Sequence, residues 1–297
     1  MTAFLYKSSF VIIYLAMLLS LMSCNADVGH TINGSVLYTY NTKLQIFDFK
    51  TTNNTMLVDV DKRTGIRAIR PAPDSLSKID EGKVLLANGT KPYVIQIYDI
   101  KDGGFQSLIE GQQPLYIPGI RKFIFKEKKP ISDLFISDID NPVVSKKLLI
   151  DHDKDERKHF YVLVSDFEFV FARKDKKAVQ LVDARTGVTT SLAIPNCSPV
   201  LWRAQLGQLL CSKFDSHGYY FVEINNPRKI EPVDLGEHGM PSLYAGSVDA
   251  LLYSVIRYEA DVGEVKDLRV RYLRTGIDVL LQKDFFVSLP GRNVWIN

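Results

Sequence analysis

The sequence predicts an all-β protein, a six-bladed β-propeller whose blades are four-stranded antiparallel sheets. Three observations predict it. A strand pattern that ends in an acidic residue and a polar turn recurs at intervals of about 45 residues, a spacing typical of propeller blades. Each copy is flanked by further short β-rich runs. No stretch has the apolar periodicity of an amphipathic helix.

The recurring strand has six copies, and the first four end in aspartate. The copies are 45–48, 96–99, 135–138, 180–183, 220–223 and a degenerate one at 269–272. A polar turn follows each aspartate, and Asp side chains at such places accept hydrogen bonds from turn amides. Asp48, Asp99, Asp138 and Asp183 are therefore expected to stabilise turns and not to form a ring of functional carboxylates.

Two further runs accompany each copy, and one more is visible in four of the units. The run before it is 36–40, 84–87, 122–125, 169–172, 209–212 or 251–254, and the run after it is 56–58, 107–109, 148–150, 191–193, 232–234 or 279–281. A fourth run precedes these at 114–116, 159–161, 199–202 and 241–244. A two-sheet sandwich is the competing architecture, but it would not require six evenly spaced hairpins. A ring of blades also leaves no large sheet edge open.

The two ends of the predicted ring have signals of their own. Asn33-Gly34 joins two runs in the first unit and is a strong two-residue hairpin signal. The segment 285–297, with Trp295 near its end, follows the sixth unit. We expect this segment to help close the ring.

The unit resembles that of TolB-type six-bladed propellers, in which a proline and an aromatic residue open the innermost strand and a hairpin ending in aspartate follows. The units at 199–223 and 241–272 carry the pattern best, and the resemblance spans residues 28–282. The Ser-Pro-Asp-Gly turn frequent in that family is absent. Ile117-Pro118-Gly119 and Gln205-Leu206-Gly207 stand in its place. The resemblance implies the blade architecture.

The start of the chain has the layout of a secretory signal. Lys7 precedes an apolar run that ends in Leu21-Met22-Ser23-Cys24. This tetrapeptide resembles the lipobox of bacterial lipoproteins, which implies cleavage before Cys24 and a diacylglycerol-modified cysteine at the mature N-terminus. The apolar run is shorter than the ~20 residues that a spanning helix requires. A cleaved signal peptide with an incidental cysteine and an uncleaved anchor stay open as alternatives.

These features predict the domain organisation and the location. We expect a signal peptide over residues 1–23, a lipidated N-terminus and short tether over residues 24–27, and one propeller domain over residues 28–297. The lipid on Cys24 would anchor the chain to a membrane of the cell envelope, facing the periplasm. Asn25 follows Cys24, which by resemblance to lipoproteins of two-membrane bacteria favours the outer membrane.

The composition bears on which partners the chain can bind and on whether its cysteines form a disulfide. The chain has 297 residues and a formal net charge of +3, and this near-neutral balance gives no argument for nucleic acid. Besides Cys24 the only cysteines are Cys197 and Cys211. Outside the cytoplasm we expect them to form a disulfide between adjacent strands, with two buried thiols as the alternative.

No residue pattern assembles a catalytic or cofactor site. The sequence lacks a Gly-x-Ser-x-Gly elbow and a phosphate-binding glycine loop, and its histidines are scattered. Asp151, Asp153 and Asp155 stand as the first ligands of a calcium loop would, but Glu156 and Val162 occupy the places of its required glycine and glutamate. We expect a solvated loop there, a weak candidate for binding a hard cation, and no cofactor.

Two classes of function follow. The favoured one is a non-catalytic binding or scaffold module that presents its loops to another envelope protein, because loops on a rigid scaffold commonly carry function. The alternative is a ligand-binding or metal-binding propeller, or an enzyme, with its site in the central channel. The missing catalytic motifs favour the first.

Overall fold

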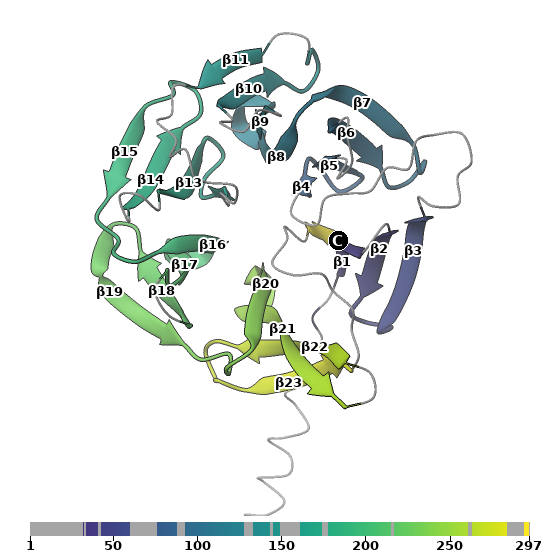
Figure 1. Ribbon diagram of the computed structural model, residues 1–297, viewed down its shortest axis with the longest axis vertical. Coiled ribbons are helices and arrows are strands. Elements are labelled where there is room, and N and C mark those ends of the chain that lie inside the picture. Colours follow the sequence, from purple (N-terminus) through teal and green to yellow (C-terminus); the bar gives the residue numbers. More distant parts are fainter. Residues whose placement is uncertain are drawn as a thin grey trace, which may run out of the picture. The chain divides into compact units, whose positions relative to one another are not determined.

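The protein is seen in a computed structural model that describes residues 32, 34–40, 43–59, 76–87, 93–127, 133–142, 145–148, 161–173, 178–214, 217–260, 263–283 and 294–296. The chain divides into two units between Asn33 and Gly34, and the strands described below belong to the second, Gly34–Asn297. Within the second unit the strands form six four-stranded antiparallel sheets around a common centre (Figure 1). The predicted all-β six-bladed propeller is therefore confirmed.

Each blade runs from an innermost first strand to an outermost fourth strand. Blade 1 is β24 (Val294–Ile296), β1 (Ser35–Tyr40), β2 (Lys43–Asp48) and β3 (Asn53–Asp59); blade 2 is β4 (Ser77–Lys78), β5 (Lys83–Ala87), β6 (Val94–Asp99) and β7 (Phe105–Glu110). Blade 3 is β8 (Gln112–Ile117), β9 (Lys122–Lys126), β10 (Leu134–Asp138) and β11 (Ser145–Leu148); blade 4 is β12 (Val162–Leu163), β13 (Glu168–Arg173), β14 (Ala178–Asp183) and β15 (Thr189–Leu192). Blade 5 is β16 (Ser198–Arg203), β17 (Gln208–Ser212), β18 (Tyr219–Glu223) and β19 (Asn226–Val233); blade 6 is β20 (Gly239–Ala245), β21 (Ala250–Glu259), β22 (Gly263–Tyr272) and β23 (Asp278–Gln282).

In the described part of the chain, three short 3₁₀ helices join first to second strands. They are η1 (Pro118–Ile120) in blade 3, η2 (Ala204–Leu206) in blade 5 and η3 (Gly246–Val248) in blade 6. Two of them lie where the sequence departs from the TolB-type turn. Within the described residues, no helix has the length and hydrophobicity needed to cross a membrane.

The C-terminal strand closes the ring. β24 pairs antiparallel with β1, with Val36 opposite Trp295, and so supplies the innermost strand of blade 1. The prediction of a hairpin at Asn33-Gly34 is wrong. A strand before Gly34 could not pair with β1, because β2 and β24 occupy both of its edges. A strand from the other end of the chain takes the place that a preceding strand would need.

One backbone hydrogen bond recurs in all six blades. The residue after the third strand donates its N–H to the carbonyl of the residue before the second strand, with N···O distances of 2.8 to 3.3 Å. The donor and acceptor pairs are Phe49 and Gly34, Ile100 and Gly82, Ile139 and Arg121, Ala184 and Phe167, Ile224 and Gly207, and Leu273 and Asp249. The bond ties the turn after the third strand to the start of the second strand at one end of each blade.

The recurrent aspartates stabilise these turns, as predicted. The Oδ1 atoms accept backbone N–H groups at 2.7 Å in the case of Asp48, 2.9 Å for Asp99, 2.9 Å for Asp138 and 2.8 Å for Asp183. The backbone hydrogen bond from Thr51 holds the pKa of Asp48 below its usual value. The carboxylates are therefore engaged within their own turns.

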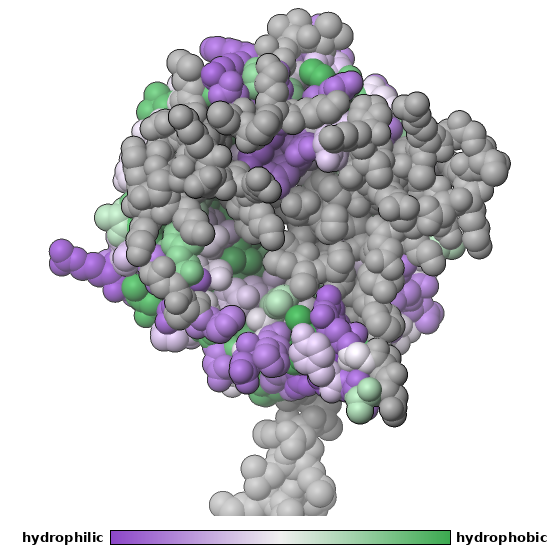
Figure 2. All heavy atoms as spheres, viewed as in Figure 1, coloured by the Kyte–Doolittle hydropathy of each residue, from purple (hydrophilic) through white to green (hydrophobic). Residues whose placement is uncertain are grey.

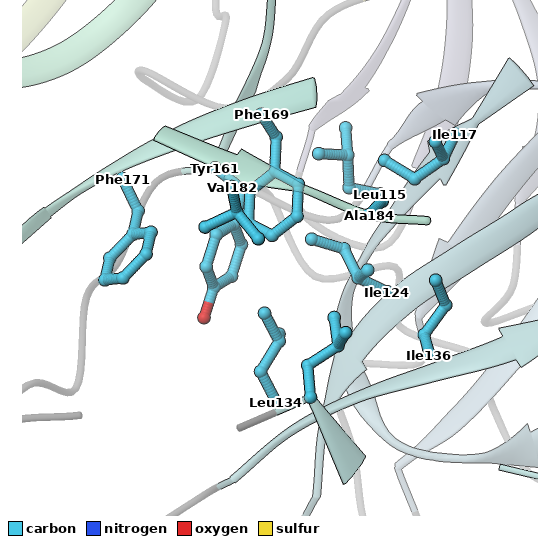
Figure 3. Packing of buried hydrophobic residues seen from close by; sticks show 11 residues of the cluster. Leu115, Ile117, Ile124, Leu134, Ile136, Tyr161, Phe169, Phe171, Val182 and Ala184 are labelled. Carbon is cyan, nitrogen blue, oxygen red and sulfur yellow. The ribbon is translucent and has the colours of Figure 1, made fainter. Parts of the chain in front are cut away.

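The core lies between the blades. Six clusters of buried apolar residues fill the six blade interfaces within the described residues. Figure 3 shows the one between blades 3 and 4, where Leu115, Ile124 and Ile136 face Tyr161 and Phe169. Packing between neighbours holds each blade in place and fixes the turns that it carries.

The surface differs from this core. Hydrophilic residues gather on the visible surface of blade 6, over β20 to β23 (Figure 2).

Candidate functional site

Several predicted site residues lie outside the described part of the chain. These are Cys24 and the loop residues Asp151, Asp153 and Asp155. Within the described residues, no group of three or more His, Cys, Asp or Glu side chains could hold a metal ion.

The two remaining predicted site residues are the cysteines of blade 5. Cys197 immediately precedes β16 and Cys211 lies in the neighbouring β17, and both are fully buried. In the structure a disulfide joins them, with the two Sγ atoms 1.99 Å apart. The bond lies within an apolar cluster between blades 4 and 5, away from the surface.

One end of the propeller gathers two turns from each of blades 2 to 6 and one turn from blade 1, and we call it the turn face. Because the strands alternate in direction, the turn between the first and second strands and the turn between the third and fourth strands lie at the same end of a blade. The turn face consists of 79–82, 118–121, 164–167, 204–207 and 246–249 from the first kind, and 49–52, 100–104, 139–142, 184–188, 224–225 and 273–277 from the second.

A buried ion pair joins blades 5 and 6 beneath the turn face. The side chain of Arg203, at the end of β16, is 6% exposed. Its Nη2 and Nε donate to Asp249 Oδ2 and Oδ1 at 2.6 and 2.9 Å, and its Nη1 donates to Gln208 Oε1 at 2.8 Å. Its guanidinium carbon lies 5.0 Å from the centre of the Phe221 ring. The innermost strand of blade 5 is thereby tied to the turn of blade 6.

Asp249 occupies an unusual backbone position. Its φ is 49°, in the left-handed region, where Asp and Asn are tolerated better than other residues with a side chain. This conformation ends η3 and brings its carboxylate to Arg203.

Hydrogen bonding keeps both partners charged. Burial by itself lowers the pKa of Arg203, but hydrogen bonds with Asp249 and Tyr244 outweigh it and the net pKa is raised. Burial likewise raises the pKa of Asp249, and the hydrogen bonds from Arg203 and Tyr244 outweigh it, so the net pKa is lowered. A desolvated pair of this kind has a large effect when one partner is removed.

The ion pair belongs to a polar network that fixes η2. Gln205 Nε2 donates to Gly246 O of blade 6 at 2.6 Å. The Tyr244 hydroxyl lies 2.9 Å from Asp249 Oδ1 and 3.2 Å from Gln205 Oε1. Leu206 follows Gln205 on this turn and is 53% exposed. An apolar side chain thus stands on a turn that blade 6 holds through Arg203 and Gln205.

Two matching turns flank this feature. Arg-Thr-Gly is followed by Val188 in blade 4 and by Ile277 in blade 6, and both side chains are exposed. Gly187 N donates to Asp183 O and Gly276 N to Tyr272 O, each at 2.8 Å, so the turns are alike. The turn face therefore exposes an apolar residue on each of three consecutive blades.

The sequence analysis places Leu206 in a turn that departs from the TolB-type pattern, but it does not mark Leu206, Val188 or Ile277 as site residues. The Arg-Thr-Gly repeat at 185–187 and 274–276 is visible in the sequence and could have marked the two outer positions. No sequence signal marks Arg203 and Asp249 as partners, because they lie 46 residues apart.

Comparison with known proteins agrees with this architecture. No family model and no curated protein matches this chain. TolB from Acinetobacter baumannii is similar with a TM-score of 0.67 and 14% sequence identity, over 90% of this chain and 67% of that one. The chain from a nidogen/laminin complex has a TM-score of 0.65 and 10% identity, over 89% and 99% of the two chains.

A putative TolB from Agrobacterium tumefaciens is also similar, with a TM-score of 0.58 and 10% identity, over 89% of this chain and 97% of that one. At these identities the likeness shows the fold alone. The chain is a six-bladed β-propeller similar in structure to the propellers of TolB and nidogen.

Proposed function

We propose that this chain is a lipid-anchored, non-catalytic module of the bacterial cell envelope that binds another protein through its turn face. The observation that carries the proposal is Leu206, an exposed apolar side chain on a turn fixed by the Arg203–Asp249 pair and by Gln205. A preordered binding residue loses little conformational freedom on association, so more of its contact energy contributes to affinity.

The surroundings of Leu206 support the same proposal. Tyr is enriched at the energetic centres of protein interfaces, and the half-buried Tyr244 belongs to the network that fixes this turn. Val188 and Ile277 add exposed apolar side chains on turns of the two neighbouring blades. The nidogen propeller, which is similar in fold, belongs to a complex with laminin.

We expect Leu206→Asp to abolish recovery of the partner by in-cell cross-linking and mass spectrometry. A charge on the fixed turn would have to be desolvated against an apolar partner surface. Met56→Asp is the matched control, because Met56 is 49% exposed but lies on the outermost strand of blade 1. Equal recovery of the same partner with both variants would refute binding through the turn face.

Anchoring is proposed from the sequence of the first 24 residues, with the lipid on Cys24 and, because Asn25 follows it, the outer membrane as destination. We expect the wild type to incorporate labelled palmitate and to sediment with outer-membrane vesicles. Cys24→Ala should lose the label, whereas the control Ser23→Ala keeps a small residue before the cysteine and should retain it. Labelling of the Cys24→Ala protein would contradict the proposal.

A further inference from the structure

A groove of about 640 Å³ lies between blades 3 and 4, at a distance of two blades from the Arg203–Asp249 network. Ile120, Ile136, Leu148 and Ala184 form its apolar part, and three of them belong to the buried cluster between these blades. The turn 185–187 of blade 4 forms the opposite wall. The groove is therefore open where the two packed blades diverge.

The charged residues that line the groove are mostly cations. Lys122, Lys146 and Lys147 come from blade 3 and Arg185 comes from blade 4, whereas Asp138 is the one acidic lining residue. Asp138 is already engaged, because its Oδ1 accepts the backbone N–H groups of the turn that follows it. The local charge is positive although the whole chain is close to neutral.

Two of these cations have their own carboxylate partners. Lys147 Nζ lies 2.7 Å from Asp133 Oδ2, and Arg185 Nη2 lies 2.6 Å from Asp183 Oδ2. Arg185 also lies over the ring of Phe167, which holds the turn against blade 4.

Lys122 and Lys146 differ from these two cations. Neither is in an ion pair with a residue that the structure describes. They lie on the same side of the blade 3 sheet, the side that faces blade 4, because Lys122 is paired with Asp138 and Lys146 with Ile136 across the strands. An anion placed between them would be attracted by both.

We propose that this groove binds an acidic segment of a partner protein in which carboxylates alternate with apolar side chains. Carboxylates would pair with Lys122 and Lys146, and apolar side chains would cover Ile136 and Leu148. A protein segment fits better than an anionic membrane, because the apolar part of the site is recessed between two blades and a flat bilayer could not reach it. The groove opens on the turn face, because residues 120, 141 and 184–187 belong to it. The inference therefore deepens the proposed function and rests on it, at a site that Leu206 does not line.

The test uses the full chain in detergent and a short fluorescein-labelled peptide in which Glu and Leu alternate, with binding followed by fluorescence anisotropy. We expect the double variant Lys122→Glu, Lys146→Glu to weaken binding roughly tenfold or more, because two attractive charges become repulsive. The matched control Lys50→Glu, Lys101→Glu makes the same charge change on exposed residues of the turns of blades 1 and 2 and should leave binding unchanged. A peptide of alternating Gln and Leu has no negative side chains. It should bind the wild type as weakly as the Glu-Leu peptide binds the double variant Lys122→Glu, Lys146→Glu.

Three results would overturn the inference. Equal losses in the two double variants would mean that overall charge attracts the peptide, and equal binding of the Gln and Glu peptides would mean that the groove is only apolar. Binding to anionic phosphatidylglycerol vesicles that disappears in the groove variant, without binding of the Glu peptide, would assign the surface to a membrane. Leu206→Asp should leave peptide binding intact, so failure of this inference and failure of the turn-face proposal are distinguishable.

Discussion

Asp249→Asn is expected to lower the free energy of unfolding by about 3–5 kcal/mol, because it removes the close counter-charge of the buried Arg203 guanidinium and leaves only the exposed Glu231, whose Oε2 lies 4.0 Å from Nη1. Asparagine keeps the size of the side chain and tolerates the positive φ of this position, so the loss isolates the charge. The side chains of Arg203 and Asp249 are 6% and 13% exposed. Water can therefore do little to solvate the guanidinium once the carboxylate charge is removed. Urea unfolding of the full chain measures the change.

Asp183→Asn is the matched control for this prediction. Asp183 and Arg185 also form a close pair, with Nη2 and Oδ2 2.6 Å apart, but the arginine side chain is 52% exposed. Water and salt screen such a pair, so its removal should change stability little. Equal losses of stability in the two variants would show that the interface pair is no more important than a surface pair.

The Arg203–Asp249 pair also predicts that the wild type and Asp249→Asn differ in stability at acid pH. The pKa of Asp249 is lowered in the folded protein, so its contribution is present above the unfolded value of about 3.9 and is lost as the pH falls through the folded value. The free energy of unfolding of the wild type should therefore fall below about pH 4 more steeply than that of Asp249→Asn. Asp183, with a pKa lowered to about 2, is present in both proteins and does not affect the comparison.

Much of the fold is predictable from sequence because its determinants are local. Alternating apolar residues specify each strand, and the terminal aspartates of the third strands bind amides only two or three residues further on. A repeat multiplies this local signal, so that a weak pattern becomes clear over six copies.

Features that depend on distant residues could not be predicted in this way. Val36 pairs with Trp295 across nearly the whole chain, and nothing in either segment identifies the other. The exposure of Leu206 is set by blade 6, whose Gly246 carbonyl fixes the turn through Gln205. In the sequence this leucine is one apolar residue among many, and only the assembled ring shows that it does not point into a blade interface.

Removal of residues 294–297 is expected to lower the free energy of unfolding by on the order of 5 kcal/mol. Folded proteins are stable by only about 5–15 kcal/mol in total. The deletion takes away β24, so the inner edge of β1 loses its backbone partners at Ser35, Val36 and Leu37. Each lost ladder hydrogen bond costs about 1 kcal/mol, and uncovering a buried valine or leucine costs about 1.5–3 kcal/mol. Val36 and Leu37 are both buried in the closed ring.

Removal of Asn297 alone is the control, because β24 ends at Ile296 and its pairing with β1 stays complete. We expect this shorter deletion to keep the wild-type urea midpoint, whereas the longer one lowers the midpoint strongly or prevents cooperative unfolding. In a ring each blade is held by two neighbours, and an incomplete first blade weakens its interfaces with both blade 2 and blade 6. The loss of stability should therefore extend beyond blade 1. An unchanged urea midpoint after removal of 294–297 would mean that the ring does not depend on this strand for closure.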